Sequence, residues 1–159
     1  MENEVKIRYT VYPSVEQLPE ADRQLYDAAM EARNDAYAPY SKFSVGCALQ
    51  LESGEIIKGS NQENAAYPSG LCAERTTIFW TAANHPNVAI TKMFVIGAPN
   101  DTLSNIPIPP CGSCRQSILE YEAKQQNPIE LFFSSVTGEV IKVHSVRDLL
   151  PFSFDGSYL

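Results

Sequence analysis

Alternating apolar and polar residues predict the strands of this chain. In residues 43–51, every second side chain from Phe43 to Leu51 is apolar, and Glu52-Ser53-Gly54 separates this segment from a second strand at residues 55–60. An alternating run that ends at a short glycine-containing segment is typical of a β-hairpin. Further strands are predicted at residues 89–97, 129–135 and 139–144, the last two joined through Thr137-Gly138.

Helical periodicity marks the segments between these strands. A helix is predicted at residues 20–37, and Pro39 ends this helix. Its apolar face is formed by Leu25, Ala28, Ala29, Ala32 and Ala36. Further helices are predicted to begin near Cys72, to span residues 112–125 and to occupy residues 145–150 before Pro151. Because helices alternate with strands along the chain, we expect an α/β layered fold around one sheet.

Residues 1–18 precede this alternating pattern. Residues 5–12 alternate apolar Val5, Ile7, Tyr9 and Val11 with more polar neighbours, which predicts a short edge strand or an extended arm. The 159 residues contain no internal repeat, low-complexity tract or interdomain linker. We therefore expect a single domain at residues 19–159, preceded by an N-terminal extension at residues 1–18.

Composition and charge exclude several classes of protein. Hydrophobic residues make up 44% of the chain and charged residues 19%, as in ordinary globular proteins. The net charge of −7 opposes binding to nucleic acid or to an anionic membrane surface. The first residues have neither a basic start nor an apolar run, and no apolar stretch reaches the roughly 18 residues of a membrane span. We expect a cytoplasmic protein.

Three of the four cysteines form a pattern typical of a zinc site. Cys72-Ala73-Glu74 is followed downstream by Pro110-Cys111-Gly112-Ser113-Cys114. A catalytic zinc usually takes three protein ligands and leaves its fourth position to water. Zinc-dependent nucleobase deaminases carry such a set, with a glutamate two residues after the first ligand and a Pro-Cys-x-x-Cys pair. We therefore expect Cys72, Cys111 and Cys114 to bind one Zn²⁺ per subunit.

The fourth cysteine, Cys47, has two interpretations. It shares the apolar face of the strand at residues 43–51, and a free cysteine there is usually a small buried hydrophobic residue. Alternatively, Cys47 is a fourth zinc ligand, and the metal site is structural.

The surrounding residues suggest how such a site works. Both cysteine clusters stand at predicted helix starts, where the helix dipole stabilises thiolates. Three thiolates on Zn²⁺ leave a charge of −1, which Arg75, three residues after Cys72, is placed to offset, and Arg115 is a second candidate. Alternatively, both are surface arginines. Glu74 is placed to move protons between water and substrate; alternatively it is a first-turn carboxylate that satisfies the helix dipole.

Several segments together give the chain a close resemblance to a known family. These segments are residues 38–46, residues 61–67, Cys72-Ala73-Glu74-Arg75-Thr76, residues 110–116 and Leu149-Leu150-Pro151. They resemble the cytidine deaminases of the small, homotetrameric, three-cysteine type. The resemblance implies a three-layer α/β/α fold with a five-stranded mixed sheet. It also implies pyrimidine salvage by hydrolysis of cytidine and deoxycytidine, in which a zinc-activated water attacks C4 while Glu74 shuttles protons.

The resemblance also implies roles for substrate-binding residues. Phe43 would lie against the pyrimidine ring, and the backbone at Ala73 would meet the carbonyl of the base. Asn61 and Glu63 would hold the ribose 3′-hydroxyl. Three further residues would complete the sites of neighbouring subunits: Ala65, Tyr67 and Phe154.

Three other functions share part of this pattern. A deaminase of a nucleoside-like antibiotic such as blasticidin S resembles the zinc motif but lacks the Asn-x-Glu element seen at Asn61 and Glu63. A polynucleotide-editing deaminase would need a basic groove, and this chain is acidic. A zinc-stapled structural domain would need four protein ligands and no open position on the metal.

Overall fold

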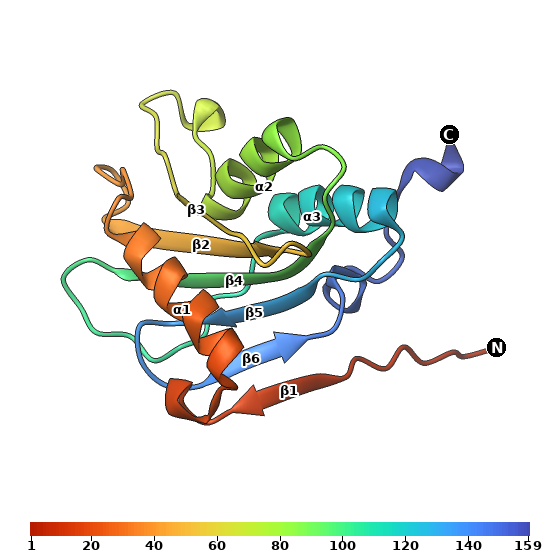
Figure 1. Ribbon diagram of the computed structural model, residues 1–159, viewed down its shortest axis with the longest axis horizontal. Helices are drawn as coiled ribbons and strands as arrows, with labels where there is room; N and C mark the ends of the chain where they lie inside the picture. Colours follow the sequence, from red (N-terminus) through yellow and green to blue (C-terminus); the bar gives the residue numbers. More distant parts are fainter.

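One mixed sheet of six strands forms the centre of the protein in the computed structural model, which describes residues 1–159 (Figure 1). The strand order is β1-β6-β5-β4-β2-β3, in which only β4 and β5 pair in parallel. The strands are β1 (Tyr9–Tyr12), β2 (Phe43–Leu51), β3 (Ile56–Ser60), β4 (Ile90–Pro99), β5 (Glu130–Ser134) and β6 (Val140–Val143).

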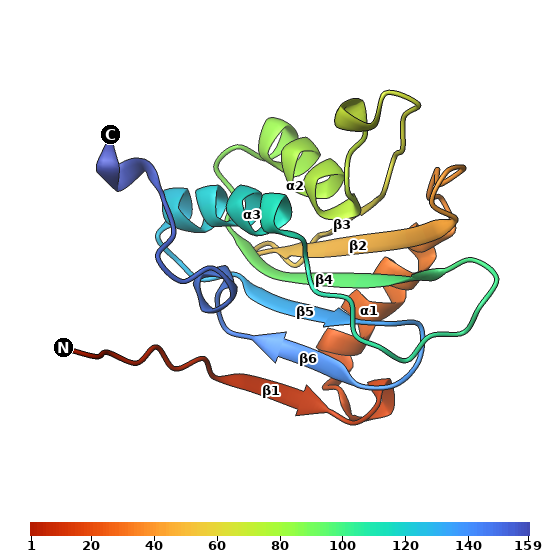
Figure 2. The same ribbon diagram turned by 180° about the vertical axis from the view of Figure 1, so that it is seen from behind.

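Helices cover both faces of this sheet (Figure 2). Helix α1 (Glu20–Arg33) lies on one face, and α2 (Ala73–Asn84) and α3 (Gly112–Gln125) lie side by side on the other. Each face has its own apolar core, the larger one beneath α2 and α3. The predicted three-layer α/β/α fold is therefore confirmed. None of the helices combines the length and the apolar composition needed to cross a membrane.

The sheet has one strand more than the five that the resemblance implies. Strand β1, from the segment before the first helix, pairs antiparallel with β6, from Tyr9 opposite Val143 to Tyr12 opposite Val140. Without β1, β6 would be the edge of the sheet, with unpaired backbone groups. The expected edge strand within residues 1–18 is thus present.

The first helix ends four residues earlier than predicted, at Arg33. The next residues leave the helix because their backbone pairs with a distant segment. The amide of Tyr37 donates to the carbonyl of Asn61 (3.0 Å), and the amide of Glu63 donates to the carbonyl of Tyr37 (2.9 Å). This pairing brings the segment after α1 against the loop after β3.

Both predicted hairpins are present, and each turn contains a glycine with positive φ, Gly54 (88°) and Gly138 (87°). The helix predicted at residues 145–150 is a single 3-10 turn, Val146–Leu149.

Two strand glycines let the helices approach the sheet closely. A Cβ on Gly46 of β2 would lie 2.0 Å from the carbonyl oxygen of Ala29 in α1. A Cβ on Gly59 of β3 would lie 2.4 Å from Oγ1 of Thr77 in α2. Glycine in a strand often marks such a close approach. The close contact at Gly59 sets the position of α2 on the sheet, and the first turn of α2 contains residues of the candidate site.

Candidate active site

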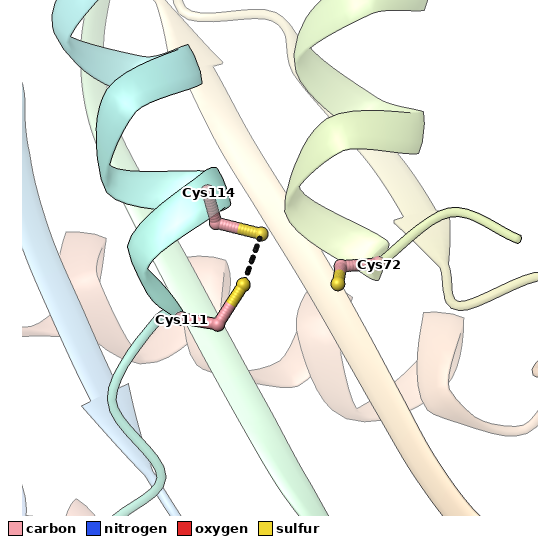
Figure 3. A group of neighbouring side chains, drawn as sticks. All are labelled: Cys72, Cys111 and Cys114. Carbon is pink, nitrogen blue, oxygen red and sulfur yellow. Dashed lines mark hydrogen bonds between the residues drawn. The ribbon is translucent and has the colours of Figure 1, made fainter. Parts of the chain in front are cut away.

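The sulfurs of Cys72, Cys111 and Cys114 lie within 4.8 Å of one another (Figure 3). They come from two segments about 40 residues apart, and the thiol of Cys111 lies 3.5 Å from that of Cys114. Three converging thiols form a ligand set that suits zinc, because thiolates are soft ligands and Zn²⁺ accepts tetrahedral sulfur coordination.

The starts of two helices hold these sulfurs. Cys72 is the N-cap of α2, and Cys111 is the N-cap of α3. Cys114 follows in the first turn of α3 and is buried. Unpaired amides and the positive end of the helix dipole favour negative charge at such positions. A metal here would join α2 to α3.

Arg75 supplies positive charge beside the cluster. One of its terminal nitrogens donates to Sγ of Cys72 at 3.9 Å, and its Nε is buried without a partner. The guanidinium of Arg115 makes different contacts, since it donates to the carbonyls of Pro110 and Leu149, both at 2.8 Å. Of the two candidate arginines, only Arg75 contacts a ligand sulfur; Arg115 ties the loop before Cys111 to the segment near Leu149.

The environment shifts the acidity of the thiols in opposite directions. Hydrogen bonding with Cys114, followed by that with Arg75, lowers the pKa of Cys72 to about 5 despite partial burial. The same contact with Cys72, together with burial, raises the pKa of Cys114. The cluster thus readily holds one thiolate, and a divalent cation would stabilise the others, because metal binding deprotonates thiol ligands.

Glu74 lies next to the cluster in the first turn of α2 and is only 5% exposed. Burial, and after it the negative charge of Cys72, raises the pKa of the Glu74 carboxyl. A carboxyl group with a raised pKa takes up and releases protons closer to neutral pH.

Cys47 lies away from the cluster. It is fully buried on β2 within the core beneath α2 and α3, and burial strongly raises the pKa of its thiol. It is not one of the three converging sulfurs. The interpretation of Cys47 as a small buried hydrophobic residue fits this position, whereas a fourth-ligand role does not.

A pocket of about 650 Å³ opens over the cluster. This is within the usual range of small-ligand sites, about 300–1,000 Å³. Eight of the predicted site residues line it, namely Phe43, Asn61, Glu63, Tyr67, Cys72, Glu74, Arg75 and Cys111.

The four other predicted site residues lie outside the pocket lining. Cys114 and Ala73 are buried in the first turns of α3 and α2. Ala65 is exposed on the loop after β3. Phe154 is 57% exposed, its ring stacks on Tyr158, and its carbonyl accepts a hydrogen bond from Gln116. Within one chain, Phe154 therefore does not contribute to the pocket.

Asn61 and Glu63 are held rigidly by the backbone around the pocket. The amide group of Asn61 donates to the carbonyl of Phe43 (3.0 Å) and accepts from the amide of Val45 (2.9 Å). The carboxylate of Glu63 accepts from the amide of Tyr40 (2.9 Å). Hydrogen bonds lower the pKa of Glu63 and keep its carboxylate charged, and the one with the side chain of Ser41 has the largest effect.

Two further lining residues, Tyr40 and Ile108, have no individual role predicted from the sequence. Tyr40 reaches the rim, where its ring lies 5.9 Å from that of Tyr67, and Ile108 enters from the proline-rich loop before α3. Tyr40 belongs to the segment 38–46 on which the resemblance rests, so the sequence carried a signal that Tyr40 lies near the site. Nothing in the local sequence around Ile108 marks it as a pocket residue.

Comparisons with known proteins place the chain in a family. The model of the cytidine and deoxycytidylate deaminase zinc-binding region matches residues 19–127, which include all three cysteines. The chain belongs to the cytidine deaminase family.

Individual relatives agree with this assignment. A cytidine deaminase of Halalkalibacterium halodurans is 37% identical over 84% of this chain and 94% of its own length. A probable cytidine deaminase of Dictyostelium discoideum is 38% identical over 78% of this chain and 84% of its own. The crystal structure of the Burkholderia pseudomallei cytidine deaminase superposes with a TM-score of 0.72 at 38% identity, covering 82% and 97% of the two chains. The predictions of a family member, of an enzyme and of zinc as its metal are thereby confirmed.

Proposed function

We propose that this protein hydrolyses the exocyclic C–N bond of cytidine and deoxycytidine, giving the uridine nucleoside and ammonia. The observation that carries the proposal is the convergence of three thiols, the buried carboxyl of Glu74 and a nucleoside-sized pocket at one point. The names of the relatives point to the same substrate.

Cys72, Cys111 and Cys114 would hold the zinc ion. When bound, zinc acts as a Lewis acid and lowers the pKa of a coordinated water toward neutrality. Arg75, with its contact to Cys72, offsets the negative charge of the thiolates. The helix starts at Cys72 and Cys111 add further positive potential.

Glu74 would move the protons of the reaction. Its carboxylate accepts a proton from the attacking water and delivers it to the ring nitrogen beside C4. It then transfers the second proton of that water to the amino group, which leaves as ammonia, while the water oxygen remains on C4 as the carbonyl. A carboxyl with a raised pKa suits both acceptance and release of protons.

The rest of the pocket would orient the nucleoside. The half-buried ring of Phe43 offers a flat apolar surface to the pyrimidine, and the backbone at Ala73 would meet the carbonyl of the base. The charged carboxylate of Glu63 is an acceptor for the ribose 3′-hydroxyl, and Asn61 keeps one amide N–H free to donate to it.

The same residues separate this function from two alternatives. A polynucleotide carries a phosphate at the 3′ oxygen, which the Glu63 carboxylate would repel, and the net charge of −7 opposes nucleic acid as a whole. The Asn61 and Glu63 pair favours a ribonucleoside over a nucleoside-like antibiotic. A cytoplasmic location stays a prediction from the sequence.

Exposed aromatic residues support a homotetramer with shared sites. Tyr67 at the pocket rim is 73% exposed, and its ring lies 5.9 Å from that of Tyr40, which is 46% exposed. Clustered exposed apolar residues mark contact surfaces. In the proposed tetramer, Ala65 and Phe154 complete the pockets of neighbouring subunits, and Tyr67, which lines the rim of the pocket of its own chain, contributes to a neighbour's pocket as well.

A spectrophotometric assay tests the proposed reaction. Zinc-loaded protein should convert cytidine and deoxycytidine to their uridine products, with stoichiometric ammonia. Removing zinc with a chelator should abolish turnover, and adding zinc back should restore it. Failure of the zinc-loaded protein to deaminate either nucleoside would refute the proposal.

A further inference from the structure

Residues 1–8 form an extended arm that continues from β1 beyond the sheet (Figures 1 and 2). The pairing of β1 with β6 begins at Tyr9, and residues 1–8 belong to no helix or strand. Every residue of the arm is exposed. Its one ion pair is internal and exposed, between Lys6 and Glu4 at 3.6 Å. The arm therefore carries backbone donors and acceptors that are free to pair with another strand.

The arm and β1 together have the pattern of an uncovered amphipathic strand. Val5, Ile7, Tyr9 and Val11 are 58%, 44%, 62% and 42% exposed. In an extended chain these alternate residues share one face, and the residues between them share the other. The other face of the arm carries its charges, at Glu2, Glu4, Lys6 and Arg8.

The order of these charges makes the arm complementary to itself. If two arms pair antiparallel about a two-fold axis at Val5, Glu2 of one copy lies opposite Arg8 of the other, and Glu4 lies opposite Lys6. The two-fold axis repeats each of these two pairs once, so four opposite-charge pairs form on one face. Val5 then meets Val5 on the apolar face. Opposite charges directly across a strand pair stabilise it.

Other registers have less of this complementarity. Moving the axis by one residue, to position 4 or 6, leaves two opposite-charge pairs instead of four. It also sets Glu4 against Glu4 or Lys6 against Lys6, and like charges directly opposite destabilise a pair. Placing the axis between two residues instead sets the charged face of one arm beside the apolar face of the other. The register centred on Val5 is thus the one that satisfies both charge and polarity.

We propose that residues 1–9 bind the same residues of a second copy of this chain as an antiparallel two-stranded ribbon centred on Val5. An isolated two-stranded ribbon is only marginally stable in water. Here each strand continues into β1, which its sheet already holds in place, so less freedom is lost on pairing. None of residues 1–9 lines the pocket over the cysteine cluster, so this contact is separate from the active site of its own chain.

Cysteine crosslinking in the full-length zinc-loaded protein tests the register. Val5→Cys should form an intersubunit disulfide under mild oxidation, because each copy places its new thiol opposite the other across the two-fold axis. Ile7→Cys is the matched control, since residue 7 lies opposite residue 3 in this register. We expect Val5→Cys to crosslink about tenfold faster or more, since disulfides require close Cα atoms. The wild-type protein gives the background from native cysteines.

Charge reversal in the Val5→Cys background tests the complementarity. An all-acidic arm (Lys6→Glu with Arg8→Glu) and an all-basic arm (Glu2→Lys with Glu4→Lys) should each slow crosslinking about tenfold, as attraction becomes repulsion. An equimolar mixture of the two should restore the rate through mixed disulfides. Cytidine turnover per subunit should be unchanged throughout, which shows that the domain remains folded.

Three results would each overturn the proposal. The first is equal crosslinking of Val5→Cys and Ile7→Cys, which would show that the register does not exist. The second is unchanged crosslinking in both charge-reversed variants, and the third is no recovery in their mixture. Either of these two would show that the charges do not select the partner.

Discussion

The four cysteines show how position in the fold decides the chemistry of a thiol. Cys47 is enclosed by the core, and burial raises its pKa, so it stays neutral. Cys72 stands half-buried at a helix start, and hydrogen bonding, first with Cys114 and then with Arg75, lowers its pKa to about 5. Metal ligation requires the thiolate. The two residues therefore provide a matched pair of substitutions.

Replacing these two cysteines by alanine should have opposite consequences for zinc. Cys72→Ala removes one of three ligands, so the protein should lose most of its zinc and its activity, and its melting temperature should fall because the metal joins α2 to α3. Cys47→Ala should keep one zinc per subunit and its activity, with a loss of stability of about 1–3 kcal/mol from the cavity. Elemental analysis and thermal unfolding measure both effects.

Loss of zinc from Cys47→Ala alone would contradict the three-ligand site. It would make the zinc site structural, with Cys47 as its fourth ligand.

At the residue scale, the sequence predicted the groups whose chemistry depends on local spacing. The cysteines and Glu74 belong to this class, because a ligand pair three residues apart and a carboxyl two residues after a ligand are local features. The contact of Arg115 with Leu149 was not predictable in the same way. It depends on where a segment over 30 residues away passes.

At the scale of elements, strands and hairpins followed from alternation, and helices α2 and α3 from periodicity and the cysteine positions. The end of α1 did not, since alanine-rich periodicity continues to Ala36 while the backbone at Tyr37 pairs with Asn61 and Glu63. That long-range pairing also builds the pocket rim. The sixth strand was implied by the alternation of residues 5–12, although the family resemblance suggested five.

At the scale of the whole molecule, one subunit leaves its pocket partly open. Tyr67 and Phe154 are exposed aromatic residues, and Phe154 does not reach the pocket of its own chain. A site that handles a small polar nucleoside must be enclosed on most sides. Neighbouring subunits can supply the missing walls without a longer chain.

Subunit mixing tests whether the sites are shared. Phe154→Ala should weaken cytidine binding, seen as a higher KM, while zinc content stays at one per subunit. Mixed with inactive Glu74→Gln subunits and allowed to exchange, it should regain some sites of wild-type affinity, because a site that takes Glu74 from a Phe154→Ala chain and Phe154 from a Glu74→Gln chain carries neither defect. Steady-state kinetics of the mixture measure this recovery.

A fully active monomer, identified by light scattering during turnover, would rule out shared sites. So would the absence of recovery in mixtures whose exchange has been verified.

The proposed reaction depends on Glu74 being the group that moves protons beside the zinc site. Glu74→Gln keeps the size and burial of the side chain but removes its ability to take up a proton. The most direct test is the cytidine turnover rate of Glu74→Gln protein whose zinc content is shown to be one per subunit. We predict a fall of at least about 10²–10⁴-fold, the usual contribution of a general acid–base group. Turnover near that of the wild type in such zinc-replete protein would contradict the account.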